Sequence, residues 1–281
     1  MAKDIRQVIN SFSQDLSPTE KKIADYLLDQ RDSAAQLTIK ELSQTIQVST
    51  ATLSRFAKRL GYQSFQELKI ALNIPSETNA DEFFSDLNQN DDLLTLAQKV
   101  FAANIASLKD TANFLDETTL ETAINLLTKA NKTGFFGIGG SQIIALDAYH
   151  KFMRTNLEAE CQSDYHLQLM LATKLTKEDC AVVISHTGRN QEILRLCEIL
   201  QENQVPIICL TSYAGSPLAK VSEVALIALA EETAYRSEAM SAIQSQFTLI
   251  DTLFMLYSVS NGAENNLARK RIRQTIKKTR I

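Results

Sequence analysis

The sequence contains no tryptophan, no closely spaced pair of cysteines and no long apolar run. A membrane-spanning helix needs about 20 consecutive apolar residues, so the chain does not read as a helical membrane protein. Cys161, Cys180, Cys197 and Cys209 lie far apart, whereas zinc sites and small disulfide frameworks rely on close spacing. We therefore expect reduced, buried thiols and no metal site. The first residues lack the apolar core of a signal peptide, and we expect a cytoplasmic protein.

Nucleotide-binding motifs are also missing or incomplete. There is no P-loop, and Gly137-x-Gly139-Gly140 resembles only the start of a dinucleotide fingerprint. The third glycine at the required spacing is lacking, and no acid ends a following strand at the usual distance. We expect no cofactor. The helical segments share no fixed period, which excludes a repeat array.

Charge is distributed unevenly along the chain, whose net charge is −4. Residues 70–98 contain six acids and no lysine or arginine, whereas residues 267–281 contain seven bases and no acid. A mean charge hides local basic surfaces of this kind. We interpret residues 77–92 as an acidic linker. The basic C-terminal tail, residues 263–281, is expected to be disordered or a frayed helix, with contact to DNA as the alternative.

Residues 1–72 have a helical pattern and no convincing strand, and we place the end of this domain at residue 76. Ser17 is placed to cap a helix that begins at Pro18, and Thr38 forms a capping box with Glu41. A third helix is predicted over residues 50–60, and Gly61 follows it where a left-handed residue is expected. Two short helices joined by a tight turn are typical of a helix-turn-helix DNA-binding domain.

The outer face of the third predicted helix is free of acids and rich in hydrogen-bond donors. Phosphates are bound by positive charge and by N–H or O–H donors, and bases are read by side chains near the start of the recognition helix. The alternative is a solvated helix face that happens to be basic. The candidate DNA-binding residues are Thr38, Ser49, Thr50, Thr52, Ser54, Arg55, Lys58 and Arg59.

From residue 133 onward, short apolar segments alternate with helical ones. This order predicts an α/β domain over residues 93–262, with a doubly wound parallel sheet of about five strands flanked by helices. Ligands then bind at the carboxyl ends of the strands. The expected strands are residues 134–138, 157–161, 180–184, 205–210 and 224–229.

The strand ending at Ile184 runs into Ser185-His186-Thr187-Gly188-Arg189-Asn190 and then a helix. Unpaired backbone N–H groups and the helix dipole favour an anion at such a helix start. Ser185 and Thr187 add hydroxyl donors, and a glycine allows close backbone approach. We predict a phosphate site here, and the alternative is an ordinary strand-to-helix connection with a polar cap.

Ordered motifs in both halves resemble the RpiR-type transcriptional regulators. The first half carries Val48-Ser49-x-Ala51-Thr52-x-Ser54-Arg55-Phe56 and Leu60-Gly61-Tyr62-x-Ser64-Phe65. The second half carries Gly137-Ile138-Gly139-Gly140-Ser141, Ile184-Ser185-His186-Thr187-Gly188 and Met240-Ser241. The resemblance covers about residues 1–260 and implies an N-terminal helix-turn-helix joined to a sugar isomerase (SIS) phosphosugar-binding domain.

The resemblance also implies a function and its partners. It implies a homodimeric or homotetrameric regulator of sugar metabolism genes, whose affinity for a double-stranded DNA operator changes when a sugar phosphate binds. The family usually has Thr at position 190 and follows Met240-Ser241 with Ser and Arg, where this chain has Asn190, Ala242 and Ile243. The implied ligand-binding residues are Gly140, Ser141, Ser185, His186, Thr187, Asn190 and Glu238.

The alternative function is a phosphosugar isomerase or lyase with an N-terminal assembly domain, because one fold serves both uses. Aldose–ketose isomerisation needs a base near the sugar C1–C2 bond. For each candidate a structural role is the favoured interpretation, and we predict no catalytic residue. The candidates are Asp147, His150, Lys151, Arg154, Asp164 and His166, with Glu232 and Glu238 as possible sugar contacts.

Overall fold

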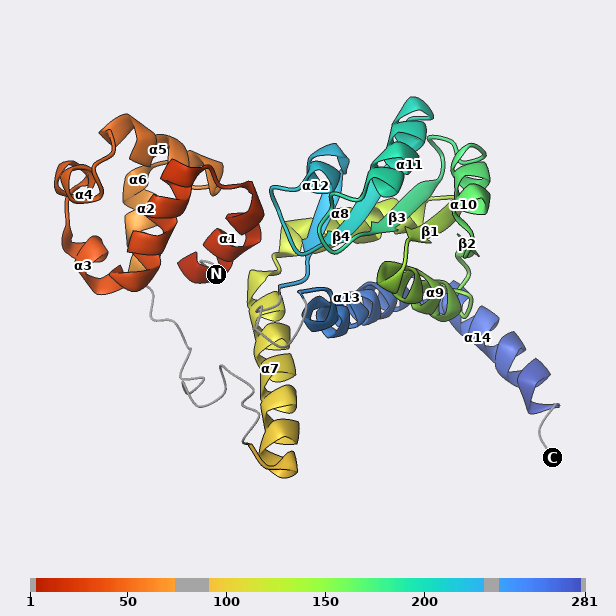
Figure 1. Cartoon of the computed structure of the whole chain (residues 1–281). Coiled ribbons are helices and arrows are strands. Elements are labelled where there is room, and N and C mark those ends of the chain that lie inside the picture. The colour runs from red at the N-terminus through yellow and green to blue at the C-terminus, as the bar shows by residue number, and fades with distance from the viewer. Residues whose placement is uncertain (1–3, 74–90, 230–237, 279–281) are drawn as a thin grey trace.

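The computed structural model of the chain describes residues 4–73, 91–229 and 238–278. A helical unit comes first, and a parallel sheet covered by helices on both faces follows (Figure 1). Among these residues, no helix combines the length and the apolar content needed to cross a bilayer. Both predicted structural classes, all-α and then α/β, are confirmed.

The helical unit closes around its own apolar core. Leu27, Leu53 and Phe56 lie at its centre, each at most 1% exposed. The capping boxes predicted from Ser17 and Thr38 are both present, with Glu20 and Glu41 as the reciprocal acids. The elements are α1 (Ile5–Phe12), η1 (Ser13–Asp15), α2 (Pro18–Asp29), α3 (Arg31–Gln36), α4 (Ile39–Ile46), α5 (Thr50–Arg59) and α6 (Phe65–Leu72).

Helix α7 (Leu93–Phe114) stands between the helical unit and the sheet (Figure 1). Asp92 caps its N-terminus, because the carboxylate accepts hydrogen bonds from the backbone N–H groups of Leu94 and Thr95, each at 2.9 Å. Helix α8 (Glu117–Lys129) then leads to the first strand. Most of the predicted acidic linker, residues 77–90, lies outside the described residues.

The sheet has five parallel strands in the order β2-β1-β3-β4-β5. Alternate residues of β3 face opposite sides: Val182 packs into one apolar cluster, and Val183 packs into the other. Burial on both faces explains why the inner strands Cys180–Ile184 and Ile207–Thr211 are almost continuously apolar, whereas the edge strand Glu158–Cys161 carries two glutamates. The strands are β1 (Lys132–Gly137), β2 (Glu158–Cys161), β3 (Cys180–Ile184), β4 (Ile207–Thr211) and β5 (Val224–Ile227).

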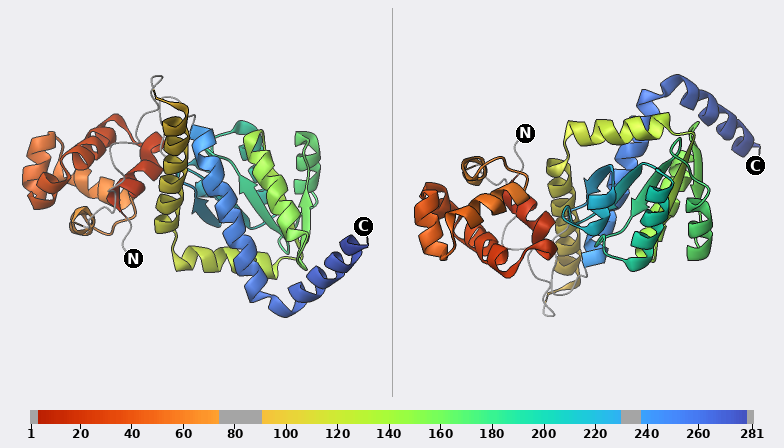
Figure 2. Two further views of the ribbon diagram at one scale, coloured as in Figure 1. Left: turned by 90° about the horizontal axis from the view of Figure 1, so that it is seen from below. Right: turned by 90° about the horizontal axis from the view of Figure 1, so that it is seen from above.

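Two layers of helices cover the sheet (Figure 2). Helices α8, α9 and α13 bury one face around Phe135 and Phe152, and α10, α11 and α12 bury the other around Phe136. The helices cover the faces of the sheet, and the turns that connect strands to helices lie at the ends of the strands. The bounds of the covering helices are α9 (Gly140–Phe152), α10 (Tyr165–Ala172), α11 (Gln191–Glu202), α12 (Pro217–Val221) and α13 (Glu238–Ser260).

Of the two expectations for the basic tail, disorder is wrong for most of that segment, whereas a helix is present. Residues Gly262–Lys277 form helix α14, which projects away from the sheet (Figure 1). Its Lys270, Arg271 and Arg273 are exposed. Its Ala, Arg, Lys and Gln residues favour helix. A continuous helix was not predicted because the segment has no apolar stripe at helical spacing. Helices α1 and α3 were also not expected from the sequence pattern.

Candidate functional site

The predicted phosphate turn lies at the point where the strand order reverses. From β1 the chain crosses to β2 on one side, and from β3 it continues to β4 on the other. Gly137 of β1 is in register with Ile184 of β3, so the turns after these two strands are neighbours. Ser141 and Ser185 therefore lie on neighbouring segments. Open α/β sheets bind ligands at such a switch point.

The turn after β3 is closed by its own hydrogen bonds. The Gly188 N–H donates to the Ser185 carbonyl at 3.1 Å, and the Arg189 N–H donates to Thr187 Oγ1 at 3.3 Å. Asn190 is the N-cap of α11, and its Oδ1 accepts from the Ile193 N–H at 3.0 Å. Asn190 therefore has the capping role that the threonine usual in the family would also fill.

Two glycines are required where they stand. Gly139 and Gly188 have φ values of +60° and +62°, which disfavour residues with a side chain. A Cβ on Gly188 would also come within 2.6 Å of Ser216 Cβ. Close packing thus requires a glycine at position 188, whereas at position 139 the positive φ alone favours it.

The turn after β1 is backed by a buried glutamine that sequence reasoning missed. Gln168, which is 1% exposed, donates from Nε2 to the Gly137 carbonyl at 2.9 Å and to Gln142 Oε1 at 3.1 Å. Its Oε1 accepts from the Gly137 N–H at 3.3 Å. Gln142 in turn donates to the Gln162 carbonyl at 3.1 Å. The network holds β1, α9 and α10 in fixed relative positions beside Ser141.

The loop after β4 is hydrogen-bonded to the phosphate turn. The Ser212 N–H donates to the His186 carbonyl at 2.9 Å, and Ser212 Oγ lies 2.9 Å from His186 Nδ1. The Leu218 N–H donates to the Gly188 carbonyl at 3.1 Å. Ser212 directly follows a strand, which is the sequence signal that could have identified it. His186 thus joins the ends of β3 and β4.

The side chains considered as catalytic bases have other partners. Lys151 pairs with Asp147 and, at 2.8 Å, with Asp251. His150 Nε2 lies 3.2 Å from an Arg154 nitrogen. Asp164 caps α10 by accepting from the Leu167 N–H at 3.1 Å, and the exposed His166 lies beside Tyr165, with ring centroids 6.0 Å apart.

Of the remaining candidates, the two glutamates fall outside what the structure describes and the glycine does not. Glu232 lies in the undescribed segment 230–237, and the side chain of Glu238, the first residue of α13, is not described either. Gly140 is the first residue of α9 and is exposed at the mouth of the β1 turn. Within the described ranges, no group of three histidine, cysteine or acidic side chains is arranged to hold a metal ion.

The predicted recognition helix is α5, and the turn before it has the expected shape. Gln47 ends α4 with φ +59°, and the side chain of Ser49 caps α5 by accepting from the Thr52 N–H at 3.1 Å. Thr38 caps α4. Thr50, Arg55 and Lys58 are exposed on α5, whereas Ser54 Oγ donates to the Thr50 carbonyl at 3.0 Å.

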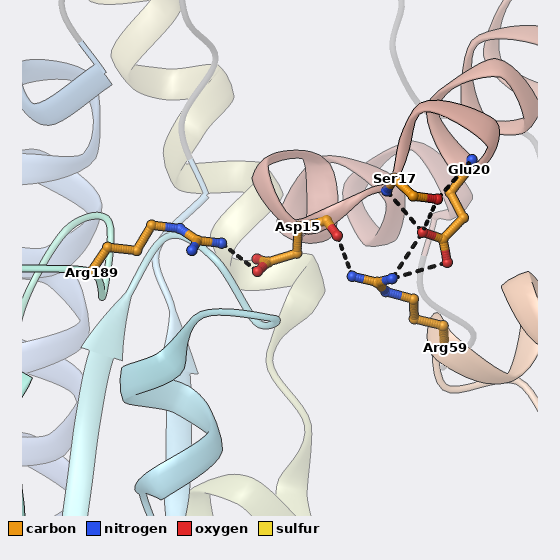
Figure 3. A network of polar contacts seen from close by, with 5 residues as sticks. All are labelled: Asp15, Ser17, Glu20, Arg59 and Arg189. Carbon is orange, nitrogen blue, oxygen red and sulfur yellow. Dashed lines mark hydrogen bonds and ion pairs between the residues drawn. The ribbon is translucent and has the colours of Figure 1, made fainter.

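Arg59 differs from the other basic residues of α5, because its guanidinium is bound within the protein (Figure 3). Nη1 lies 3.0 and 2.8 Å from the two carboxylate oxygens of Glu20, and Nη2 donates to the Asp15 carbonyl. Burial raises the pKa of Glu20, but hydrogen bonds from Ser17 and the charge of Arg59 outweigh it, and the pKa is lowered overall. Arg59 therefore has a structural role in the conformation described.

The cysteines are unpaired thiols, as the sequence indicated. Burial raises the pKa of Cys180, Cys197 and Cys209 to about 12, and it also raises the pKa of the half-buried Cys161. A thiol with so high a pKa is a poor nucleophile and a poor metal ligand near neutral pH. Cys180, Cys197 and Cys209 belong to the apolar cores, and Cys161 lies partly buried at the edge of one of them.

Comparison with protein families identifies both halves of the chain. Residues 3–78 match the model "Helix-turn-helix domain, rpiR family", and residues 126–256 match "SIS domain". An uncharacterized HTH-type transcriptional regulator of Caldanaerobacter subterraneus is 34% identical, over 90% of both chains. The HTH-type transcriptional regulator HexR of Pseudomonas aeruginosa is 33% identical, over 99% of this chain and 97% of that one.

Solved structures share the fold. The Vibrio vulnificus NanR protein complexed with ManNAc-6P superposes with a TM-score of 0.61 at 22% identity, over 98% of this chain and 99% of that one. Phosphoheptose isomerase GmhA of Neisseria gonorrhoeae superposes with a TM-score of 0.51 at 20% identity, over 60% of this chain and all of that one. The sheet domain thus has the fold of both regulators and isomerases.

Proposed function

This chain belongs to the rpiR family of helix-turn-helix transcriptional regulators with a SIS domain, and we propose that a sugar phosphate bound at the ends of β1 and β3 controls its affinity for operator DNA. In this proposal residues 1–76 bind DNA, residues 77–92 connect, and residues 93–262 bind the ligand. The double-stranded operator is contacted by a homo-oligomer, since two recognition helices dock on half-sites about one helical turn apart.

One observation carries the ligand proposal. The turn after β3 is rich in hydroxyl groups, contains Gly188 in a left-handed conformation, lies at the switch point of the sheet and leads into the N-terminus of α11. That arrangement presents backbone N–H groups and a partial positive charge to an anion. We assign the phosphate to Ser185, His186, Thr187 and Asn190, and the sugar to the neighbouring segment. The residues on that segment are Gly140 and Ser141 after β1, with Glu238 at the start of α13.

A sensor role is favoured over an isomerase role by the partners of the candidate bases. Lys151, Asp147 and Asp164 hold ion pairs and helix caps. The helix-turn-helix adds an exposed, acid-free basic surface that an assembly domain does not need. Incubation of the pure protein with aldose phosphates should give no ketose product, and turnover would contradict the sensor proposal.

The ligand is identified by thermal denaturation against a panel of sugar phosphates that includes N-acetylmannosamine 6-phosphate. A compound that binds only the folded state raises its stability by about 2.7 kcal/mol at 100 times Kd. The double variant Ser185→Ala with Thr187→Ala should lose that stabilisation and keep operator binding. Arg55→Ala should lose operator binding and keep the stabilisation. Equal loss of both activities in each variant would contradict this division of roles.

A further inference from the structure

Arg189 belongs to the phosphate turn, but its side chain points toward the helical unit (Figure 3). There its guanidinium forms an ion pair with Asp15 Oδ1, at the end of η1. The two residues are 174 positions apart in the chain. The carboxylate of Asp15 is nearly enclosed, with 8% of the side chain exposed, and its Oδ2 is a buried atom that no hydrogen-bond partner reaches.

A second contact joins the same two parts of the molecule. The Ala214 N–H, in the loop after β4, donates to the Ser11 carbonyl at the end of α1 at 2.8 Å. A Cβ on Gly215 would lie 2.8 Å from Asp15 Oδ2 and 3.0 Å from the Phe12 ring, so this glycine allows Asp15 to approach. The same loop holds the phosphate turn through Ser212 and His186.

These contacts form a continuous path from the phosphate turn to the recognition helix. Arg189 binds the Asp15 carboxylate, the Asp15 carbonyl accepts from Arg59, and Arg59 is the last residue of α5. Arg59 is also held by Glu20, the capping-box acid of α2. A change at Arg189 therefore alters the ion pair that holds Asp15 at the end of η1, and the carbonyl of the same residue contacts Arg59 at the end of α5.

We propose that Arg189 is a further ligand-responsive residue, for which the phosphate group of the sugar and the carboxylate of Asp15 compete. This inference rests on the proposed function, because it needs an anion in the turn after β3. A guanidinium binds carboxylate and phosphate with the same forked geometry. When the phosphate takes Arg189, Asp15 is left as an enclosed charge without its counter-ion, which is unfavourable.

The helical unit then moves off the loop formed by residues 212–216, and α5 moves with it. The ligand acts because it binds the separated arrangement more tightly than the docked one, which is the requirement for any such coupling. In this proposal the docked arrangement of Figure 3 binds the ligand less tightly than the separated one. Asp15 serves as an internal substitute for the phosphate.

The competition is tested by calorimetry on the full chain, with inorganic phosphate and N-acetylmannosamine 6-phosphate as probes. Asp15→Asn removes the competing charge and keeps the carbonyl that Arg59 binds, so it should tighten probe affinity about threefold to tenfold. Arg189→Gln should weaken affinity. Adding Asp15→Asn to Arg189→Gln should then have no further effect, because the contested guanidinium is gone.

A steric variant tests the same interface without changing any charge. Gly215→Ala places a methyl group against Asp15 and should also tighten probe affinity. The matched control is Gly262→Ala, where a Cβ would meet nothing within 4 Å. In hydrogen exchange, the Ala214 amide should exchange at least about tenfold faster in Gly215→Ala and in probe-saturated wild type than in free wild type or Gly262→Ala.

The outcomes separate the two proposals. Equal probe affinity in wild type and Asp15→Asn, with the Ala214 amide unchanged on probe binding, overturns the competition and leaves the phosphate site in place. Binding to Asp15→Asn but not to wild type supports the competition in its strongest form. Failure of every variant to bind either probe overturns the phosphate site and the competition together.

Discussion

Arg55 and Arg59 lie four residues apart on α5 and have different surroundings. Arg55 is exposed, whereas Arg59 binds Glu20 and the Asp15 carbonyl. An ion pair at the surface contributes up to about 1 kcal/mol. We predict that Arg59→Ala lowers the free energy of unfolding by about that amount. Urea denaturation measures the change, with Arg55→Ala as the control that should leave stability unaltered.

Glu20 gives the helical unit a dependence on acid pH. Burial raises its pKa, but hydrogen bonds from Ser17 and the charge of Arg59 lower it further, so that the folded-state value lies below the unfolded one. Its stabilising contribution is therefore complete above the unfolded pKa of about 4.3 and is lost as the pH falls through the lower folded value.

The predicted consequence is a pH-dependent difference between wild type and Glu20→Gln. Glutamine keeps the capping box but loses the charge. Wild type should be the more stable protein at pH 7, and the difference should shrink as the pH falls below about 4. Denaturant titrations at several pH values measure this. A difference that stays constant across that range would show that the charge of Glu20 contributes nothing.

Asn190 combines two requirements at the start of α11: it caps the helix, and it borders the predicted phosphate. The two roles respond differently to substitution. Asn190→Asp keeps a capping oxygen and adds negative charge, so stability should be unchanged while sugar phosphate affinity falls. Asn190→Thr should preserve both, and Asn190→Ala should cost about 1 kcal/mol of stability. Calorimetry and urea denaturation separate the effects.

The helix starts could be predicted from the sequence because their signals are local. Ser17, Thr38 and Ser49 cap helices through residues three positions away, and the apolar runs of the sheet mark its strands. Gln168 and the pair of Arg189 with Asp15 could not be predicted in this way. Their partners lie 31 and 174 positions away, and no periodicity records such a distance. Helix α1 did show the spacing of a buried stripe, with Ile5, Val8 and Ile9 in the core.

The candidate ligand site was predictable in its position but not in its connections. The order strand, hydroxyl-rich turn, helix placed Ser185 and Thr187 at a strand end, and the structure brings that strand beside β1. The sequence pattern assigned Arg59 to DNA together with the rest of the basic face. The structure binds its guanidinium to Glu20 and Asp15, because charge patterning shows the sign of a residue and not its partner.

The described residues form separate apolar cores, one in the helical unit and two on the faces of the sheet. Contacts of a few residues join the units, among them Gln7 with Asp110, Asp15 with Arg189, and Phe114 of α7 against the helical core. We predict that calorimetry of the full chain resolves two unfolding transitions. A saturating sugar phosphate should raise the temperature of the sheet transition but not that of the helical transition, because the ligand competes with the contacts that dock the helical unit. A single transition that shifts as one would contradict this independence.

The same division determines the order in which the chain acquires structure during synthesis. The central side chains of the helical core come from residues 5–72, so this unit can fold while the ribosome is still adding the sheet. The sheet must wait longer, since β1 pairs with β3 and the helix α13 that covers them begins at Glu238. Local contacts form faster than distant ones, and domains fold as units from the N-terminus. The growing chain therefore carries a finished helical unit, with Asp15 in place, before Arg189 is made.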